Sequence, residues 1–391
     1  MGFASGAISY RRYIISGKPF GTVTDEFVAA LNNFAIGNQG SSDPSQQIGW
    51  IGSQHIFDRA MTGEKIALGR YAHFSLRVDK LSVPSNVARS LMRMEEEAAL
   101  AASGREFLSK TERRTAREAA KLQIEKETKS GTYRRIAAYP LLIDLESNTL
   151  LFANTSAATS DTLIELFGNT FQRALHPMDA DSLAERLLEK NSRALEQVRP
   201  VHFVPMPEDF GDPGTDAANV QFLGKEFLTW LWFLTDRGET EKLQMRNGDD
   251  LTVAIDRTLR LECDFRMTGT DVITCDAPGG LPEARAALAI GKQPTKAGLV
   301  LGTSLGEFAL TLDGQKMNVS GLIVPTDDDQ NDPQSAVEDR FEHAFDCATI
   351  IDVLYETFLQ HRVSNNWQAT MDEMSAWARG GVRTPKLIAS A

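Results

Sequence analysis

The stretch Phe74-Ser-Leu-Arg-Val-Asp-Lys-Leu-Ser-Val-Pro84 carries the chain from a strand-like run into a long helical region. The strand-like run is expected to extend from Lys65 to Val78. Pro84 favours the first turn of a helix, because the N–H that proline lacks would have no intrahelical partner there. The stretch therefore predicts a junction at which a sheet strand leads directly into a helix.

A pair of charged helices is predicted after this junction. The apolar face of the first helix comprises Val87, Leu91, Met94 and Ala98. Gly104 interrupts this helix, and Ser109-Lys-Thr-Glu112 has the form of a capping box that starts the second one. The second helix is expected to end near Ser130, where Gly131 can adopt the left-handed conformation. Because its apolar content is low, this helix is not expected to be fully buried.

Strand-like runs occur on both sides of the helix pair, among them Ala7 to Ile15 and a hairpin pattern from Tyr139 to Ala153. Others fill the second half of the chain, which ends in helices. The expected fold is α+β, with mixed or antiparallel sheets and long helices. A segment rich in proline and glycine indicates a boundary between an N-terminal α/β region, 1–205, which contains the helix pair (84–130), and a β-rich C-terminal region, 206–391.

The bulk composition is that of a globular protein, with 42% apolar and 24% charged residues. No run approaches the roughly 18 apolar residues of a membrane span, and no secretory signal pattern opens the chain, so a cytoplasmic protein without a membrane partner is expected. Cys263, Cys275 and Cys347 lack the CxxC spacing of a zinc site. No nucleotide-binding loop or nucleophile motif occurs. We therefore expect no enzymatic activity, no metal and no cofactor.

Positive charge is concentrated in one part of an acidic chain. The segment from Gly104 to Arg135 contains ten Lys and Arg residues against five Glu, which gives it a charge of +5. Because the whole chain carries −12, the remaining residues carry −17. The segment contains the second charged helix, so a basic element on an otherwise acidic molecule is predicted.

Helical geometry gathers the cations of this helix on one side. At about 100° per residue, five of them fall within an arc of roughly 100° and form a stripe about 16 Å long. These residues are Lys110, Arg113, Arg114, Arg117 and Lys121. Glu112 and Glu118 fall outside the arc. A stripe of this length can follow several phosphates of a duplex, with little sequence preference because phosphate contacts do not read bases.

Three alternatives to DNA binding follow from the same residues. The basic face can be solvated, or it can dock a protein partner. A metal-dependent nuclease is suggested by the triplet Glu127-Thr-Lys129, although such triplets are common in charged helices.

Asp327, Asp329 and Asn331 imitate a calcium loop, but the position that requires glycine is Asp332, which favours a helix cap.

The aromatic residues from Lys225 to Leu234 also allow two interpretations. Trp230, Trp232 and Phe233 lie close together in this run. Aromatic side chains can stack on the bases of single-stranded nucleic acid. A helix buried in the core or in a subunit interface explains the cluster better, because large aromatic side chains contribute most when they are removed from water.

Several stretches, in this order, resemble the RdgC family of bacterial recombination-associated proteins. Those in the first region include Ile48-Gly-Trp-Ile51, the junction 74–84, Leu108-Ser-Lys-Thr-Glu-Arg-Arg114 and Leu150-Leu-Phe-Ala-Asn-Thr-Ser156. Those in the second are Phe222-Leu-Gly-Lys-Glu-Phe-Leu-Thr-Trp-Leu-Trp232 and Val319-Ser-Gly-Leu-Ile-Val-Pro325, which look like a longer-chain branch of the family. The likeness therefore spans most of the chain.

The resemblance implies a horseshoe-shaped subunit that closes with a second copy into a ring around double-stranded DNA. It also implies a non-enzymatic, nucleoid-associated role in recombination, through competition with a RecA-type recombinase. Carried over to this chain, the residues expected on the basic inner wall are Arg77, Lys80, Arg89, Arg93, Lys110, Arg113, Arg114, Arg117 and Lys121.

Overall fold

The computed structural model describes residues 2–38, 45–129, 131–189, 192–203, 222–240, 243–263, 269–325 and 332–380. Within these ranges no helix combines the length and the apolar character that a membrane span requires. Asp327, Asp329 and Asn331 of the calcium-like pattern lie outside them. Asp332, which follows, caps a helix by accepting hydrogen bonds from the backbone N–H groups of Gln334 and Ser335.

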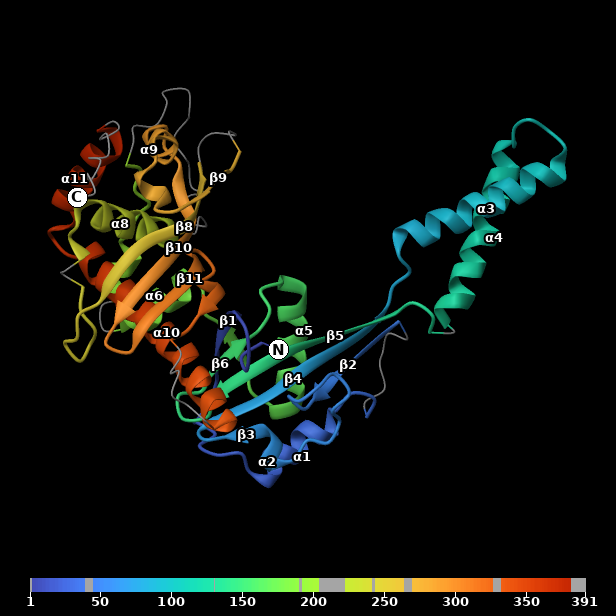
Figure 1. The fold of residues 1–391 in the computed structure, drawn as a ribbon, viewed down its shortest axis with the longest axis horizontal. Helices are drawn as coiled ribbons and strands as arrows, with labels where there is room; N and C mark the ends of the chain where they lie inside the picture. The colour runs from blue at the N-terminus through green and yellow to red at the C-terminus, as the bar shows by residue number, and fades with distance from the viewer. Residues whose placement is uncertain are drawn as a thin grey trace.

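One open antiparallel sheet runs through the described part of the molecule (Figure 1). Its strand order is β2-β4-β5-β6-β1-β12-β11-β10-β8-β9, and β3 and β7 pair with β4 and β1. The strands of the first half are β1 (Ile8–Ile15), β2 (Gln46–Ile51), β3 (Ala67–Leu68), β4 (Tyr71–Leu81), β5 (Arg134–Asp144), β6 (Thr149–Phe152) and β7 (Leu175–Pro177). Those of the second half are β8 (Thr252–Glu262), β9 (Asp271–Cys275), β10 (Gln293–Thr303), β11 (Gly306–Asp313) and β12 (Asn318–Ile323). The predicted α+β class is confirmed.

The N-terminal strand joins the two halves of this sheet. Along one edge of β1, Arg11 to Ile14 pair with β6, and along the other, Ile8 and Tyr10 pair with β12. The sheet is therefore continuous across the boundary that the sequence places at 205, and 204–221 lie outside the described residues. The division into 1–205 and 206–391 stays a prediction.

The helices cover both faces of the sheet and leave one pair apart. Over the first half lie α1 (Asp25–Asn33), α2 (Gly63–Ile66) and α5 (Ala157–Phe171). A C-terminal lobe, which we define as β8 to β12 with their covering helices, contains α6 (Ala180–Leu187), α7 (Ser192–Glu196), α8 (Leu223–Arg237), α9 (Pro282–Ala289), α10 (Pro333–Arg362) and α11 (Trp367–Arg379). The remaining pair, α3 (Ser85–Ser103) and α4 (Lys110–Lys129), stands at the far end of the β4–β5 ladder.

The strand predicted from Lys65 to Val78 is wrong at its beginning. Lys65 belongs to the short helix α2, and only after β3 and a turn at Gly69, with φ of +57°, does β4 begin at Tyr71. The turn reverses the chain so that β3 pairs antiparallel with β4. Sequence periodicity did not reveal it because the run is apolar on both sides of the turn.

Two hydrophobic cores lie on the two faces of the sheet. Trp50, Phe74 and Phe167 belong to the core beneath α1 and α5, which contains only residues of the first half. The other core lies under α8 and α10 and includes Phe3 and Tyr10 from the first half together with most apolar residues of the C-terminal lobe. Because this second core draws on both halves, the lobe and the first half are packed together.

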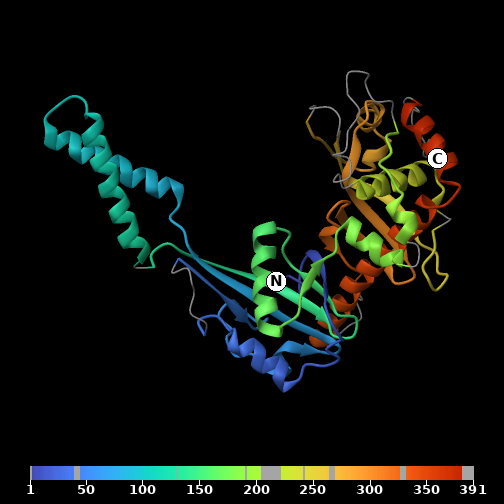
Figure 2. The ribbon, with the colours of Figure 1, turned by 180° about the vertical axis from the view of Figure 1, so that it is seen from behind.

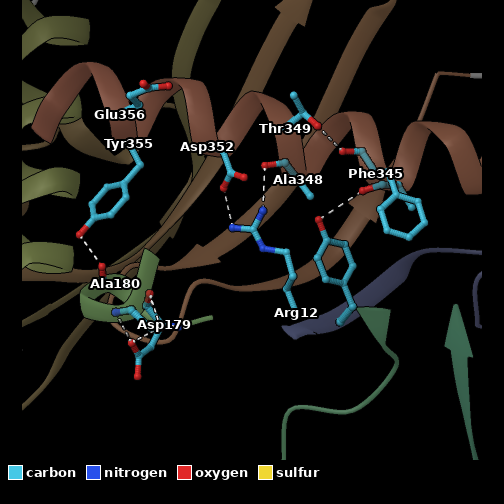
Figure 3. Close-up of polar contacts among 12 residues, drawn as sticks. Arg12, Asp179, Ala180, Phe345, Ala348, Thr349, Asp352, Tyr355 and Glu356 are labelled. Carbon is cyan, nitrogen blue, oxygen red and sulfur yellow. Dashed lines mark hydrogen bonds and ion pairs between the residues drawn. The ribbon is translucent and has the colours of Figure 1, made fainter. Parts of the chain in front are cut away.

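An ion pair between a buried guanidinium and a partly exposed carboxylate fixes the long helix α10 to β1 (Figure 3). Arg12 is 6% exposed, and its Nη2 lies 2.6 Å from Oδ1 of Asp352. Its Nη1 donates to the carbonyl oxygen of Ala348 at 3.3 Å. Farther along α10, the hydroxyl of Tyr355 donates to the carbonyl oxygen of Ala180. These contacts align α10 across the joint between the two halves of the sheet.

The aromatic helix α8 is buried inside the C-terminal lobe. Trp230 and Trp232 are 5% and 1% exposed, and Nε1 of Trp232 donates to the carbonyl oxygen of Gly279. The guanidinium of Arg285 lies over the rings of both Trp232 and Trp377. The prediction of a buried helix is confirmed, and these rings are not placed to stack on bases.

Candidate nucleic-acid interface

The helical arm, which we define as α3, α4 and the turn between them, is built by the local signals in its sequence. Gly104 ends α3 with φ of +62°, a left-handed conformation that glycine adopts without a steric cost. At the start of α4 the capping box is complete: the Glu112 N–H donates to Ser109 Oγ, and the Ser109 N–H donates to Glu112 Oε2. The hydrogen bond to Ser109 lowers the pKa of Glu112.

The arm buries little of itself. No residue of α3 is buried, and Ala116 and Ala120 are the buried residues of α4 within its described side chains. The small alanine side chains let the two helices approach closely while the longer side chains around them remain in solvent. The arm therefore displays its charged residues on a surface that a large ligand can reach, and Figures 1 and 2 show it well away from the C-terminal lobe.

A groove of about 900 Å³, which we call the arm groove, runs between α3 and α4. Two cations of α3 and three of α4 line it against two carboxylates. The cations are Arg89, Arg93, Arg114, Arg117 and Lys121, and the carboxylates are Glu96 and Glu118. The charged side chains of the groove thus sum to +3. They come from two helices, and only the resemblance to the RdgC family had predicted that cations of both helices share one surface.

Two of the groove arginines are already paired. Arg117 Nε lies 3.0 Å from Oε1 of Glu96 on the other helix, and Arg114 Nε lies 3.4 Å from Oε1 of Glu118. All four side chains are 30% or more exposed, so each pair contributes about 1 kcal/mol or less. Water and a competing anion can both reach these arginines.

Glu118 corrects the expected separation of charges on α4. It lies outside the basic arc by sequence, yet its side chain reaches back one turn to Arg114 and lines the arm groove. The contact of Glu96 with Arg117 could not be predicted from the sequence, because it depends on the register of α3 against α4. The positive charge that the stripe offers to a ligand is therefore lower than its five cations alone indicate.

Two of the five predicted stripe residues do not line the groove. Lys110 and Arg113 are exposed on α4 and do not line the groove. The groove residues Arg89 and Arg93 are exposed on α3, where Nε of Arg89 donates to the carbonyl oxygen of Ser85. The arc predicted by helical periodicity thus places its cations in solvent, but only three of its five members line the groove.

Arg77 must be removed from the predicted interface. It is 3% exposed, and its guanidinium makes two hydrogen bonds to the carboxylate of Asp79, at 2.7 and 2.8 Å. A third runs from Nη1 to the carbonyl oxygen of Ile56. A guanidinium committed in this way neutralises Asp79 and closes the loop around Ile56 instead of facing a ligand.

Lys80 lies elsewhere, at the root of the arm, which we define as the last part of the β4–β5 ladder before the helices. It is exposed and directly opposite Arg135 in the register of the two strands. Arg135 ends the basic segment and is not among the inner-wall residues that the resemblance implies. Strand pairing is what brings it beside Lys80, and a single sequence does not reveal that register.

The residues described offer little to a metal. They contain no cluster of three or more His, Cys, Asp or Glu side chains placed to hold an ion. Glu127, from the triplet that suggested a nuclease, accepts a hydrogen bond from the hydroxyl of Tyr133, where α4 returns to the sheet. Its carboxylate therefore stabilises the root of the arm through a hydrogen bond.

No protein-family model matches this sequence, and no curated protein is similar enough to it to count as a match. The RdgC resemblance therefore stays a prediction from the ordered motifs.

Proposed function

We propose that this protein binds double-stranded DNA without sequence preference and that the helical arm supplies the principal contact. The observation that carries the proposal is the arm groove, where five cations from two helices face two carboxylates. Guanidinium groups match phosphate oxygens in charge and in hydrogen-bonding geometry. Four of the five groove cations are arginines.

The type of contact follows from the side chains. The groove cations are suited to phosphates, and such contacts hold a duplex without reading its bases. Each neutralised phosphate releases counterions and contributes about 0.9 to the slope of log K against log salt. Because Arg114 and Arg117 are shared with carboxylates, we expect a slope between about −3 and −5 for the groove.

The acidic remainder of the molecule supports the same proposal. Outside the segment from Gly104 to Arg135 the chain carries −17. A surface of this sign repels phosphate, so the duplex is directed to the arm instead of being distributed over the whole protein. Net negative charge and DNA binding are compatible when the cations are gathered in this way.

We extend the proposal to a ring of two subunits around the duplex and to competition with a RecA-type recombinase. The support for this extension is the resemblance to the RdgC family. The arm and the C-terminal lobe stand at opposite ends of the sheet, so a second subunit would have two separate places to make contact (Figure 2).

A second candidate is a protein partner for the arm. Met94, Phe107 and Leu122 are 62%, 74% and 60% exposed. Large apolar side chains with this exposure are found at protein contacts, and all three belong to the arm. A protein contact on these residues is compatible with a duplex in the groove.

Charge reversal in the groove tests the proposal. Arg89, Arg93 and Lys121 line the groove and have no carboxylate partner within the described residues, so changing all three to Glu reverses the unpaired positive charge without replacing a member of either ion pair. We expect at least about a tenfold loss of affinity, equal for unrelated duplexes, because phosphate contacts are lost. Fluorescence anisotropy with two labelled duplexes measures it.

The matched control is Lys316→Glu, a charge reversal at an exposed residue between β11 and β12, compared with the single groove reversal Arg93→Glu, which makes the same change in net charge. It should change affinity far less than a single reversal in the groove. If the triple variant binds both duplexes as the unaltered protein does, the arm is not the DNA-binding surface.

A further inference from the structure

The root of the arm carries more positive charge than its own carboxylates can neutralise. Four cations lie on the adjoining ends of β4 and β5, and Asp79 is the acidic residue between them in these two strands. The cations are Arg77, Lys80, Arg134 and Arg135. Which of them are paired depends on the face of the sheet that each side chain occupies.

One face holds a closed network. Asp79 binds Arg77 with both carboxylate oxygens, and Arg134 Nη2 lies 2.7 Å from Asp79 Oδ2. The same nitrogen of Arg134 donates to Oε1 of Gln47 on β2. The carboxylate of Asp79 is 1% exposed and serves two arginines. It therefore has no capacity left for the other face.

Lys80 and Arg135 share that other face. They are direct cross-strand partners in the β4–β5 ladder, and partners in register project on the same side of a sheet with Cβ atoms about 5 Å apart. Both are exposed, and neither forms an ion pair within the described residues. Like charges placed directly opposite one another destabilise a ladder. The repulsion is relieved when an anion binds between them.

We infer that Lys80 and Arg135 form a second phosphate-binding point at the root of the arm, distinct from the arm groove. Neither residue lines that groove. A lysine and an arginine side by side offer several N–H donors to one tetrahedral anion, which suits a phosphate better than a planar carboxylate. If the bound phosphate belongs to a DNA duplex, the inference rests on the proposed function. If the ligand is a free phosphate, the inference does not depend on the proposed function.

The test compares Arg135→Gln and Lys80→Gln with Arg134→Gln. Arg134 is the matched control, because it is the neighbouring arginine of the same strand but is held by Asp79 and Gln47. For a duplex, Arg135→Gln and Lys80→Gln should each reduce the magnitude of the salt slope by about 1 and weaken binding by roughly three- to tenfold at low salt. Arg134→Gln should leave the slope within about 0.3 of the original value.

A second arm of the experiment uses pyrophosphate at constant ionic strength. It is performed on proteins whose unpaired groove residues Arg89, Arg93 and Lys121 are changed to Gln, so that the remaining groove cations, Arg114 and Arg117, stay paired with Glu118 and Glu96. Pyrophosphate should raise the Tm of this background and of its Arg134→Gln derivative, and the rise should disappear with Arg135→Gln.

The outcomes separate the two proposals. If the unaltered protein binds duplexes and Arg135→Gln binds them with the same salt slope, the second phosphate point is overturned and the proposed function stands. If pyrophosphate stabilisation depends on Arg135 while no duplex binds, the phosphate point stands and the proposed function fails. If neither ligand distinguishes Arg135→Gln from Arg134→Gln, the inference is wrong.

Discussion

Whether a single arginine of this chain is available to a ligand depends on its nearest carboxylate. Arg77 and Arg93 both belong to the basic set predicted from the sequence. The first is enclosed with Asp79, whereas the second lines the arm groove without an ion pair within the described residues. A single sequence gives the charge of each arginine. It does not give the strand pairing and loop closure that decide whether this charge is available to a ligand.

His73 provides a prediction at the same scale. Its ring is 8% exposed between Phe3 and Phe341, and its Nε2 has no hydrogen-bond partner within the described residues. Burial lowers the pKa of His73 from 6.5 to about 4, so the folded protein keeps it neutral. As the pH falls from about 6.5 to 4, the unfolded chain takes up the proton first. The free energy of unfolding therefore falls, by about 3 kcal/mol at most from this residue.

Chemical denaturation as a function of pH measures this contribution. His73→Gln should abolish that part of the pH dependence, whereas His176→Gln, at an exposed histidine, should retain it. A pH dependence that is identical in His73→Gln and in the unaltered protein contradicts the assignment.

At the scale of elements, the residues near each helix end predicted the features that depend on local geometry. The capping box at Ser109, the stop at Gly104 and the solvent-exposed arc of α4 follow from nearby residues, and the structure contains each of them. The arm groove was not predicted, because it depends on how α3 lies against α4. The same register places Glu96 against Arg117 and lowers the charge available to a ligand.

The role of Glu96 can be tested with a neutral replacement. Glu96→Gln releases Arg117 for phosphate, so duplex affinity should rise about two- to fivefold at low salt. Glu125→Gln is the control, because Glu125 is exposed on the same arm and forms no ion pair within the described residues. It makes the same change in net charge. Equal gains in the two variants, measured by anisotropy, would show that the pairing of Arg117 does not limit binding.

At the scale of the whole molecule, the central place of β1 was beyond the sequence patterns. The run from Ala7 to Ile15 predicted a strand, but its pairing with β12 joins residues more than 300 positions apart. Nor does the sequence place Asp352 of α10 against Arg12 of β1. Long-range pairing of this kind leaves no mark in hydrophobic periodicity, because each partner retains the pattern of its own element.

We expect the Arg12–Asp352 ion pair to contribute to the free energy of unfolding by holding α10 against β1. Asp352→Ala leaves a buried guanidinium without its counterion, so the free energy of unfolding should fall by about 3 kcal/mol. Replacing both partners, as in Arg12→Met with Asp352→Leu, should recover most of this loss. Glu356→Ala, which breaks the more exposed pair with Arg246 on the same helix, should cost about 1 kcal/mol or less. Equal losses for Asp352→Ala and Glu356→Ala in urea denaturation would contradict the coupling.

The central claim is that an acidic protein binds duplex DNA through phosphates at its helical arm. The most direct measurement is the salt dependence of binding by the unaltered protein to two duplexes of unrelated sequence. We predict parallel lines of log K against log salt, with slopes of about −3 to −5 from the groove and somewhat steeper if the root of the arm contributes. Affinity that does not change with salt, or that differs greatly between the two sequences, would contradict the account.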